Sequence, residues 1–413
     1  MSTAGTRGPV SSLDRPGELT VEKIDSLEGV EALRGDWDRL QDCCPTKHVL
    51  LDHRWVTAWL KWFGEGKEIH FLLLRRSGRL VGIAPLILTR GWEAFPARDS
   101  RLQIAEDYAH LRVPRWRRFV PIRRVSFPLN IPSQNGRMHW LLAEDSSELY
   151  QAVLRYWAER ASQWDMLVLE GLPVDSAQPG RIREVAGRSS LRVLPHGKVT
   201  TLYFADLKGS MEAFLKTRTG HFRKNLKTDL RSNERAGRIE VDEHRGSGVE
   251  AGLDIMFDVE RRTWKARRTP ANPVFLPLDD RIRGFFRDAA RAFTGTDDAQ
   301  VLVMKLNGDP VGGIFSLSRE KVVLGMLIYL DDALRGVVTS AHLWQAFFER
   351  SIERGMVRLD SNANTINAQK WANGSASFRR LYLFHSGTYS RILGGAKAGA
   401  TWLSRSLRRI GKK

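Results

Sequence analysis

One hairpin sequence occurs twice in this 413-residue chain, and this repeat constrains the fold more than any other feature. Phe71 to Leu88 (FLLLRRSGRLVGIAPLIL) aligns without a gap with Val301 to Ser318 (VLVMKLNGDPVGGIFSLS), and Gly78 matches Gly308. Each copy has an apolar run, a turn containing glycine and a second apolar run, which is typical of a β-hairpin. A repeated supersecondary unit predicts a duplicated module.

A second stretch of the two copies matches further along the chain. Leu149 to Ala152 corresponds to Leu343 to Ala346, and both sequences have the periodicity of a helix. A short apolar strand follows each helix, at Met166 to Glu170 and at Met356 to Asp360. The order hairpin, helix, strand therefore occurs twice, which predicts tandem modules of one mixed α/β fold.

The repeat divides the chain into three parts. We expect an N-terminal module at residues 20–197, a C-terminal module at residues 198–390 and a basic amphipathic tail at residues 391–413. The tryptophans of Trp55 to Phe63 have helical core spacing, which favours packing over a ligand cage.

The formal charge is +18, from 65 Lys and Arg against 47 Asp and Glu. Three segments concentrate the bases: Leu111 to Arg124, Lys216 to Arg238 and Arg391 to Lys413. Clustered bases favour an anionic partner, with a solvated surface as the alternative.

Several classes of protein are disfavoured. The longest apolar run, Val322 to Leu330, is shorter than the roughly 20 residues of a membrane span. The first 16 residues lack the apolar core of a signal peptide, so we expect a cytoplasmic protein. Phosphate-loop, serine-hydrolase, HExxH and CxxC motifs are absent, and we expect no metal site.

An anion site is predicted after the apolar strand Val322 to Leu330. A helix begins at about Thr339 and Ser340, either of which can cap it. The free amides of its first turn attract phosphate, and Arg335-Gly336 stands just before them. The alternative is an ordinary capped connection with a surface arginine.

This order of elements resembles the GNAT acyltransferase superfamily, in which such a turn holds the pyrophosphate of acyl-CoA. The resemblance implies mixed, mostly antiparallel sheets flanked by helices, with acetyl-CoA or another acyl-CoA as co-substrate. The family turn has a second glycine where this chain has Val338. By this resemblance the acyl-CoA site comprises Arg335, Gly336, Val337, Val338, Thr339 and Ser340.

The chain more specifically resembles the CelD-like branch, which is associated with cellulose and exopolysaccharide biosynthesis and is related to the Fem-type aminoacyltransferases. The resemblance rests on Trp55 to Phe63, Phe222 to Leu226, Glu260 to Trp264 and the end Asp360 … Lys370-Trp371. Gln369 stands where the branch usually has tyrosine.

The C-terminal copy is expected to hold the acyl-CoA. Asp145 and Glu148 stand at the start of the first copy's helix, where they repel phosphate, whereas the second copy has no acid there. The resemblance implies direct acyl transfer from a thioester to an amine or hydroxyl.

Four residues are candidates for the chemistry. Asp360 is predicted to act as base or acceptor-orienting group, or else to cap the following loop. Tyr329 is predicted to protonate the thiolate, or else to be a half-buried strand aromatic. Lys370 and Trp371 are predicted to line the acceptor cleft, or else to pack at the surface.

The leading function is thus transfer of an acyl group, such as acetyl, to a cell-envelope, saccharide or small-molecule acceptor. The alternatives are an aminoacyltransferase that uses aminoacyl-tRNA and a non-catalytic protein that binds polyanions or membranes. Leu403, Leu407 and Ile410 share one face of a basic tail helix, which predicts contact with an anionic membrane. Glycines at 394, 395 and 399 limit this helix to about Ala400 to Ile410.

Overall fold

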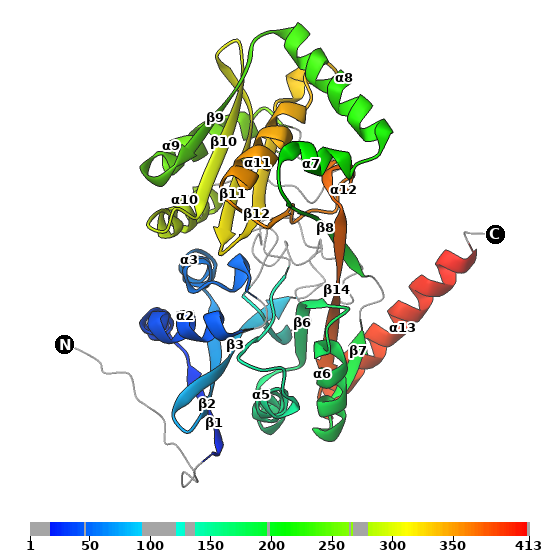
Figure 1. Ribbon diagram of the computed structural model, residues 1–413. Coiled ribbons are helices and arrows are strands. Elements are labelled where there is room, and N and C mark those ends of the chain that lie inside the picture. Colours follow the sequence, from blue (N-terminus) through cyan, green and yellow to red (C-terminus); the bar gives the residue numbers. More distant parts are fainter. Residues whose placement is uncertain are drawn as a thin grey trace.

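The computed structural model describes residues 17–44, 47–92, 121–128, 137–195, 199–263, 266 and 280–410 (Figure 1). The described strands form one 14-stranded sheet with the order β1-β2-β3-β4-β6-β14-β8-β13-β12-β11-β10-β9. Two short strands lie off this path, because β5 pairs with β3 and β7 pairs with β14.

The elements follow the chain in two groups. The first group contains β1 (Leu19–Ile24), α1 (Leu27–Ala32), α2 (Arg34–Cys43), α3 (His53–Phe63), β2 (Lys67–Arg76), β3 (Arg79–Trp92), β4 (Pro121–Ser126), β5 (Leu141–Leu142), α5 (Ser147–Glu159), β6 (Met166–Pro173), α6 (Gln178–Arg188) and β7 (Arg192–Pro195). The second group contains β8 (Thr200–Asp206), α7 (Met211–Lys216), α8 (Gly220–Ala236), β9 (Ile239–Arg245), α9 (Val249–Glu260), α10 (Asp280–Thr294), β10 (Ala299–Leu306), β11 (Asp309–Arg319), β12 (Val322–Leu330), α11 (Ala341–Glu353), β13 (Arg358–Asp360), α12 (Ile366–Trp371), β14 (Gly374–Phe384) and α13 (Thr388–Ile410).

The backbone of the two hairpins confirms the repeat. The pairing of β2 with β3 has a register shift after Leu74, and that of β10 with β11 has one after Met304, the aligned position. Both turns have two residues of positive φ, at Ser77-Gly78 (50° and 75°) and Asn307-Gly308 (52° and 92°). A turn with two residues of positive φ has a backbone twist that matches the right-handed twist of the flanking strands. The predicted class, a mixed α/β chain of duplicated modules, is confirmed.

Both modules have the same strand pairing, and they share one sheet. In each, antiparallel strands lead to one parallel junction, β4 with β6 and β12 with β13. The long strand β14 then joins the modules, because Gly374–Phe378 pairs with β8 and the remainder pairs with β6 and β7 (Figure 1). The expected division at residue 197 therefore divides the sequence into two modules, whereas the sheet continues across both of them.

Alternating residues of β10 pack on opposite faces of the second module. Val301 and Val303 point into the core that contains α9 and α10. Leu302 and Met304 point into the core that contains α11 and α8. This period of two is the geometry of a strand buried on both faces, and it explains the continuous apolar run in the sequence.

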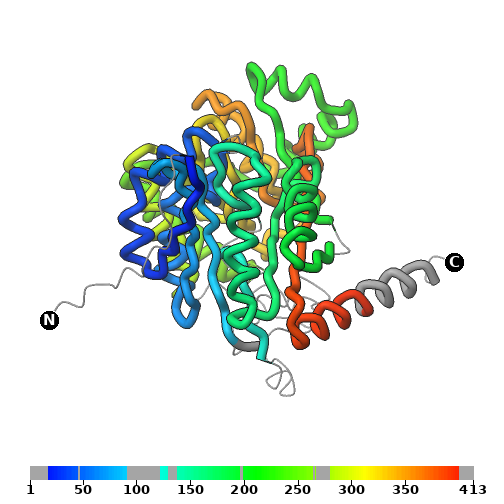
Figure 2. Tube along the Cα trace, turned by 90° about the horizontal axis from the view of Figure 1, so that it is seen from below, coloured from blue at the N-terminus to red at the C-terminus, as the bar shows by residue number. Residues whose placement is uncertain are grey.

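Helix α3 of the first module packs on α10 of the second (Figures 1 and 2). Trp55 contacts Phe285 edge to face, with ring centroids 4.9 Å apart. Trp55 and Trp59 are fully buried, so the packing role predicted for these tryptophans is confirmed. The two modules share a hydrophobic core at this contact.

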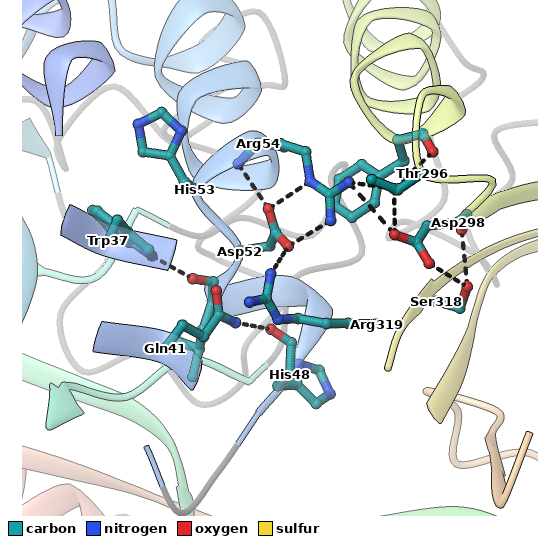
Figure 3. A network of polar contacts seen from close by, with 12 residues as sticks. Trp37, Gln41, His48, Asp52, His53, Arg54, Thr296, Asp298, Ser318 and Arg319 are labelled. Atoms are coloured by element: carbon teal, nitrogen blue, oxygen red, sulfur yellow. Dashed lines mark hydrogen bonds and ion pairs between the residues drawn. The ribbon is translucent and has the colours of Figure 1, made fainter. Parts of the chain in front are cut away.

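A polar network lies beside this apolar contact (Figure 3). Asp52 caps α3, and its side chain is completely buried. It accepts hydrogen bonds from Arg54 of the same helix and from Arg319 at the end of β11. Arg54 also donates to Thr296 of the second module at 2.7 Å. Charge pairs therefore fix the orientation of the two modules.

The C-terminal helix α13 is longer than the sequence indicates. It runs without interruption from Thr388, so the expected limit near Ala400 is wrong. Packing outweighs the low helix propensity of glycine here. A Cβ atom at Gly394 would lie 3.1 Å from the ring of Phe384, so glycine allows the helix to pack closely on this ring. Leu393 is buried beside it. None of the helices in the described ranges has the length and apolarity needed to cross a bilayer.

Candidate active site at the splayed strands of the second module

Strands β12 and β13 separate soon after they meet. They pair in parallel over three residues only, from Val322 with Arg358 to Leu324 with Asp360. Strand β12 continues to Leu330, and among the described strands none pairs with this edge beyond Leu324. We call the part of β12 from Gly325 to Leu330, which has no described strand beside it on this side, the open edge.

A β-bulge lies where the strands separate. Phe315 pairs with Leu327 and Ser316 with Gly325, so Met326 is the extra residue of β12. Bulges re-aim backbone and side chains and often occur beside active sites. The open edge of β12 thus begins at an irregular backbone, and an N–H group there can bind a carbonyl oxygen.

The open edge leads into the β12–α11 loop, residues 331–340. Gly336 has a φ of +86°, and a Cβ atom there would meet nothing within 4 Å. The N–H groups of Val337 and Val338 both donate to the carbonyl of Leu334, each at 2.9 Å. These two amides are therefore occupied within the loop, contrary to the expectation that they bind a phosphate. Arg335 is exposed beside them.

Asn233 of α8 holds the end of this loop. Its side chain is fully buried, accepts a hydrogen bond from Thr339 N–H at 2.8 Å and donates to the Thr339 carbonyl at 2.9 Å. It also contacts Nδ1 of His342 at 3.1 Å. We did not predict this residue, although its position on the apolar side of α8, three residues after Leu230 and seven after Leu226, is a signal in the sequence.

The first turn of α11 retains a small anion site. Thr339 Oγ1 accepts from Ala341 N–H at 3.3 Å, so Thr339, and not the Ser340 side chain, caps the helix. In the part of the chain that the structure describes, the N–H groups of Ser340, His342 and Leu343 have no protein acceptor. These three amides and the positive end of the helix dipole suit a single phosphate.

The equivalent position of the first module is occupied by ion pairs. Arg181 contacts Asp145 at 3.1 Å and also donates to Ser147 at the start of α5. Arg76 contacts Glu148 at 2.5 Å. The acidic residues seen in the sequence are thus held at this helix start, where they leave no place for a phosphate.

Asp360 is buried in an ion pair between the modules. Its Oδ2 atom accepts from Nη1 of Arg137 at 2.7 Å, and its Oδ1 atom accepts from Asn362 N–H at 2.8 Å. Burial acts to raise the pKa of Asp360, but the charge and hydrogen bond of Arg137 outweigh it and hold that pKa below its ordinary value. A carboxylate of this kind is a poor proton acceptor, so its contacts favour an orienting or capping role.

Two first-module residues complete the surroundings of Asp360, and the sequence did not reveal either. Arg137 also donates to Asn362 at 3.1 Å. Burial, aided by the charge of Arg137, lowers the pKa of His48 to about 3, so this imidazole is neutral near pH 7. Residues distant in the sequence meet here only because the modules share a sheet.

Tyr329 lies apart from Asp360. It follows Leu324, the partner of Asp360, by five residues, which places the two roughly 16 Å apart along the strand. Its side chain packs in the core with α9, while Ile328 and Leu330 pack on the side of α11. Burial raises the pKa of Tyr329, and the charge of Glu260 raises it further. The structure therefore does not place the two predicted catalytic residues around one reacting atom.

The two predicted cleft residues differ in their surroundings. Trp371 is buried and stacks on Trp344, with ring centroids 6.1 Å apart, and Phe222 meets its ring edge at 5.3 Å. These contacts agree with the alternative in which Trp371 packs against its neighbours and does not line the acceptor cleft. Lys370 is exposed, and its carbonyl accepts from Arg218 at 2.9 Å. Among the described residues no group of three His, Cys, Asp or Glu could hold a metal ion.

Part of the chain matches the model of a known protein family. Residues 220–365 match the family model described as acetyltransferase (GNAT) domain. This segment includes α8, the second hairpin, the open edge of β12, the β12–α11 loop and Asp360. This match agrees with the resemblance to the GNAT superfamily that the sequence shows. No curated protein matches the chain.

Two solved structures resemble the whole chain. The structure of FemX has a TM-score of 0.50 at 11% identity, over 84% of this chain and 95% of that chain. A conserved protein of unknown function from Bacteroides thetaiotaomicron has a TM-score of 0.50 at 9% identity, over 84% of this chain and 97% of that chain. At these identities the likeness concerns the fold alone.

Proposed function

We propose that this protein transfers an acyl group, with acetyl the first candidate, from acyl-CoA to an amine or hydroxyl. The observation that carries the proposal is the separation of β12 from β13 next to the bulge at Met326, on the strand that leads to the α11 N-terminus. It lies inside the segment that matches a GNAT domain. Met326 precedes Leu330 by four residues, roughly 13 Å along the strand, a distance that an extended pantetheine arm can cover.

Each part of the site then has a role. Arg335 and the amides of Ser340, His342 and Leu343 bind a phosphate of the donor. An N–H group of the open edge polarises the thioester carbonyl near Met326. Asp360 lies at this acyl end and orients the acceptor through its remaining lone pairs. Tyr329, which stays protonated, is too far along β12 to share a reacting atom with Asp360, so its role as proton donor is the weaker part of the proposal.

The acceptor is proposed to belong to polysaccharide or cell-envelope synthesis. The resemblance to the CelD-like branch supports this class, and the shared core keeps both modules beside the acceptor side of the site. The rival donor is aminoacyl-tRNA, which the net charge of +18 favours. Competition between tRNA and acetyl-CoA for the protein distinguishes the two donors.

Acetyl-CoA is expected to slow amide hydrogen exchange across Arg335 to Leu343. The Asn233→Ala variant should weaken acetyl-CoA binding by about tenfold, since it removes hydrogen bonds of about 1 kcal/mol that hold Thr339. Exchange mass spectrometry and calorimetric titration measure the two effects.

The matched control for this prediction is Asn225→Ala on the same helix. Asn225 is exposed, and its one side-chain hydrogen bond among the described residues is to His221, at 3.0 Å, so its replacement should leave acetyl-CoA affinity within about twofold. Protection at Asp145 to Gln151 in place of the β12–α11 loop would assign the donor to the first module and contradict the proposal.

The C-terminal helix is proposed to place the enzyme on an anionic membrane. Removal of residues 400–413 should reduce binding to anionic vesicles by at least tenfold, because each base near such a surface contributes about 1 kcal/mol. A chain ending at Gly399 keeps Leu393 and Lys397, which are buried. Co-sedimentation with anionic and neutral vesicles measures the difference. Equal binding of both chains to anionic vesicles would exclude this role for the tail.

A further inference from the structure

Helix α8 presents a row of unpaired bases to solvent. We define the basic stripe as Arg223, Lys224, Lys227, Arg231 and Arg235, all of which are exposed. None of them makes an ion pair with another described residue, whereas the exposed arginines of α10 pair with acids of α9. Like charges four residues apart destabilise a helix, and an anionic surface laid on them relieves this repulsion.

The stripe is long compared with the phosphates of one nucleotide. From Arg223 to Arg235 the helix rises by about 18 Å, at 1.5 Å per residue. Figure 1 shows α8 at the outer end of the second module, beyond the sheet. Coenzyme A has a pyrophosphate and one 3′-phosphate on a single nucleotide, too compact a group to contact the whole stripe.

The stripe and the predicted donor site lie on opposite sides of one helix. Asn233 is buried on the side of α8 away from Arg231 and Arg235, and it holds Thr339 through two hydrogen bonds. A partner bound on the stripe is therefore separated from the start of α11 by about the 10 Å diameter of α8, a distance that an extended pantetheine arm can cover. This start offers the free amides of Ser340, His342 and Leu343, enough for one phosphate, because the amides of Val337, Val338 and Thr339 are occupied.

A single phosphate and an extended acidic surface occur together in one kind of donor. We propose that the basic stripe docks an acidic carrier protein, which delivers the acyl group as a 4′-phosphopantetheine thioester. The one phosphodiester of this arm occupies the α11 N-terminus, and acidic side chains of the carrier face the stripe. This inference rests on the proposed acyltransferase function and replaces acyl-CoA with a carrier-bound acyl group as the preferred donor.

The composition of the exposed face of α8 favours a protein partner. The helix also carries Asp229 and the exposed Glu234, which contacts His342 at 3.8 Å, so the charge pattern is mixed. Mixed patterns suit the complementary surfaces of two proteins, whereas a nucleic-acid backbone presents one sign of charge. The exposed residues of α8 include no Phe, Tyr or Trp for base stacking and no aliphatic residue for insertion into lipid.

The transfer itself is the same as with coenzyme A. The acceptor nitrogen or oxygen bonds to the thioester carbon, and the carbon–sulfur bond breaks with its electron pair on sulfur. The proton that the acceptor loses ends on the sulfur, so the products are the acylated acceptor and the free thiol of the carrier.

The test measures binding of labelled, acetylated holo-acyl carrier protein to the full chain by fluorescence anisotropy. Arg223→Glu, Lys227→Glu and Arg231→Glu together should weaken binding by at least tenfold, and the three corresponding glutamine changes should weaken it less. A variant with Arg34→Glu, Arg155→Glu and Arg183→Glu has the same change in charge on the first module, at exposed bases that form no ion pair with another described residue. It should bind within about twofold of the wild type.

The phosphopantetheine arm gives a second measurement. The acetylated holo-carrier should slow hydrogen exchange at Arg335 to Leu343, and the apo-carrier, which lacks the arm, should not. If acetyl-CoA protects this loop but no carrier binds through the stripe, the inference is wrong and the acyltransferase proposal stands. If neither acetyl-CoA nor the holo-carrier protects the loop, the proposed function fails. Stripe-dependent binding of tRNA without binding of the carrier would replace the inference with a nucleic-acid partner.

Discussion

Replacement of Asp360 by asparagine is expected to lower the free energy of unfolding by about 3–5 kcal/mol. The substitution keeps the size of the side chain but leaves the guanidinium of Arg137 buried without its counter-charge, and the Arg137 side chain is only 7% exposed. Urea unfolding at pH 7 measures the loss. A companion Arg137→Gln change should recover part of it, because the double variant contains no unpaired buried charge.

The pair Asp206–Arg358 provides a matched control at the other end of β13. Arg358 of β13 lies opposite Asp206 of β8, and their side chains are 41% and 43% exposed. Asp206→Asn should therefore cost no more than about 1 kcal/mol. If Asp360→Asn were as mild as this control, burial of the Arg137 pair would not be a source of stability.

The same variant separates an orienting role from a structural one. If Asp360 orients the acceptor, the kcat of the folded Asp360→Asn protein should fall while its affinity for acetyl-CoA is unchanged. If Asp360 only caps the loop, the substitution should lower stability and leave the kcat of the folded protein unchanged. Its low pKa predicts no loss of activity near pH 6 from titration of this carboxyl group, since it stays ionised far below neutrality.

The duplication was predictable because each hairpin is coded locally. Matching turns such as Ser77-Gly78 and Asn307-Gly308 need no information from outside their own hairpin. The helix start at Thr339 was predictable for the same reason. The burial of Trp371 was not predictable, because a tryptophan between polar residues can either pack in the core or line a cleft.

The contacts between modules were beyond the reach of the sequence. Arg137 meets Asp360 across 223 positions of the chain, and no periodicity indicates such a pair. The hydrophobic pattern also does not predict that β14 pairs with strands of both modules, because its apolar residues would be buried equally well beside a strand of either module. The resemblance placed Val337 and Val338 in the acyl-CoA site, and the bonds that their amides make to Leu334 could not be predicted, because such bonds depend on the loop's exact backbone.

Asp52→Asn is expected to cost about 3–5 kcal/mol, since it leaves Arg54 and Arg319 without their shared counter-charge in a nearly buried place. Both arginines have side chains that are 12% exposed, and Asp52 itself has none of its side chain exposed. Asparagine still caps a helix, so the loss reports the charge and not the cap. Asp42→Asn, which removes the exposed partner of Arg319, should cost no more than about 1 kcal/mol.

The effect of Asp52 should depend on pH in one direction. Burial acts to raise its pKa, but hydrogen bonds and charge from Arg54, with the charge of Arg319, hold that pKa below its ordinary value. A group whose pKa is depressed by folding stabilises the folded state above its unfolded pKa of about 3.9, and this contribution is lost as the pH falls. The difference between wild type and Asp52→Asn should therefore shrink between pH 6 and pH 3 in denaturant titrations. A difference that stayed constant over this range would mean that the modules are joined by the apolar contact of α3 with α10 and not by the charge of Asp52.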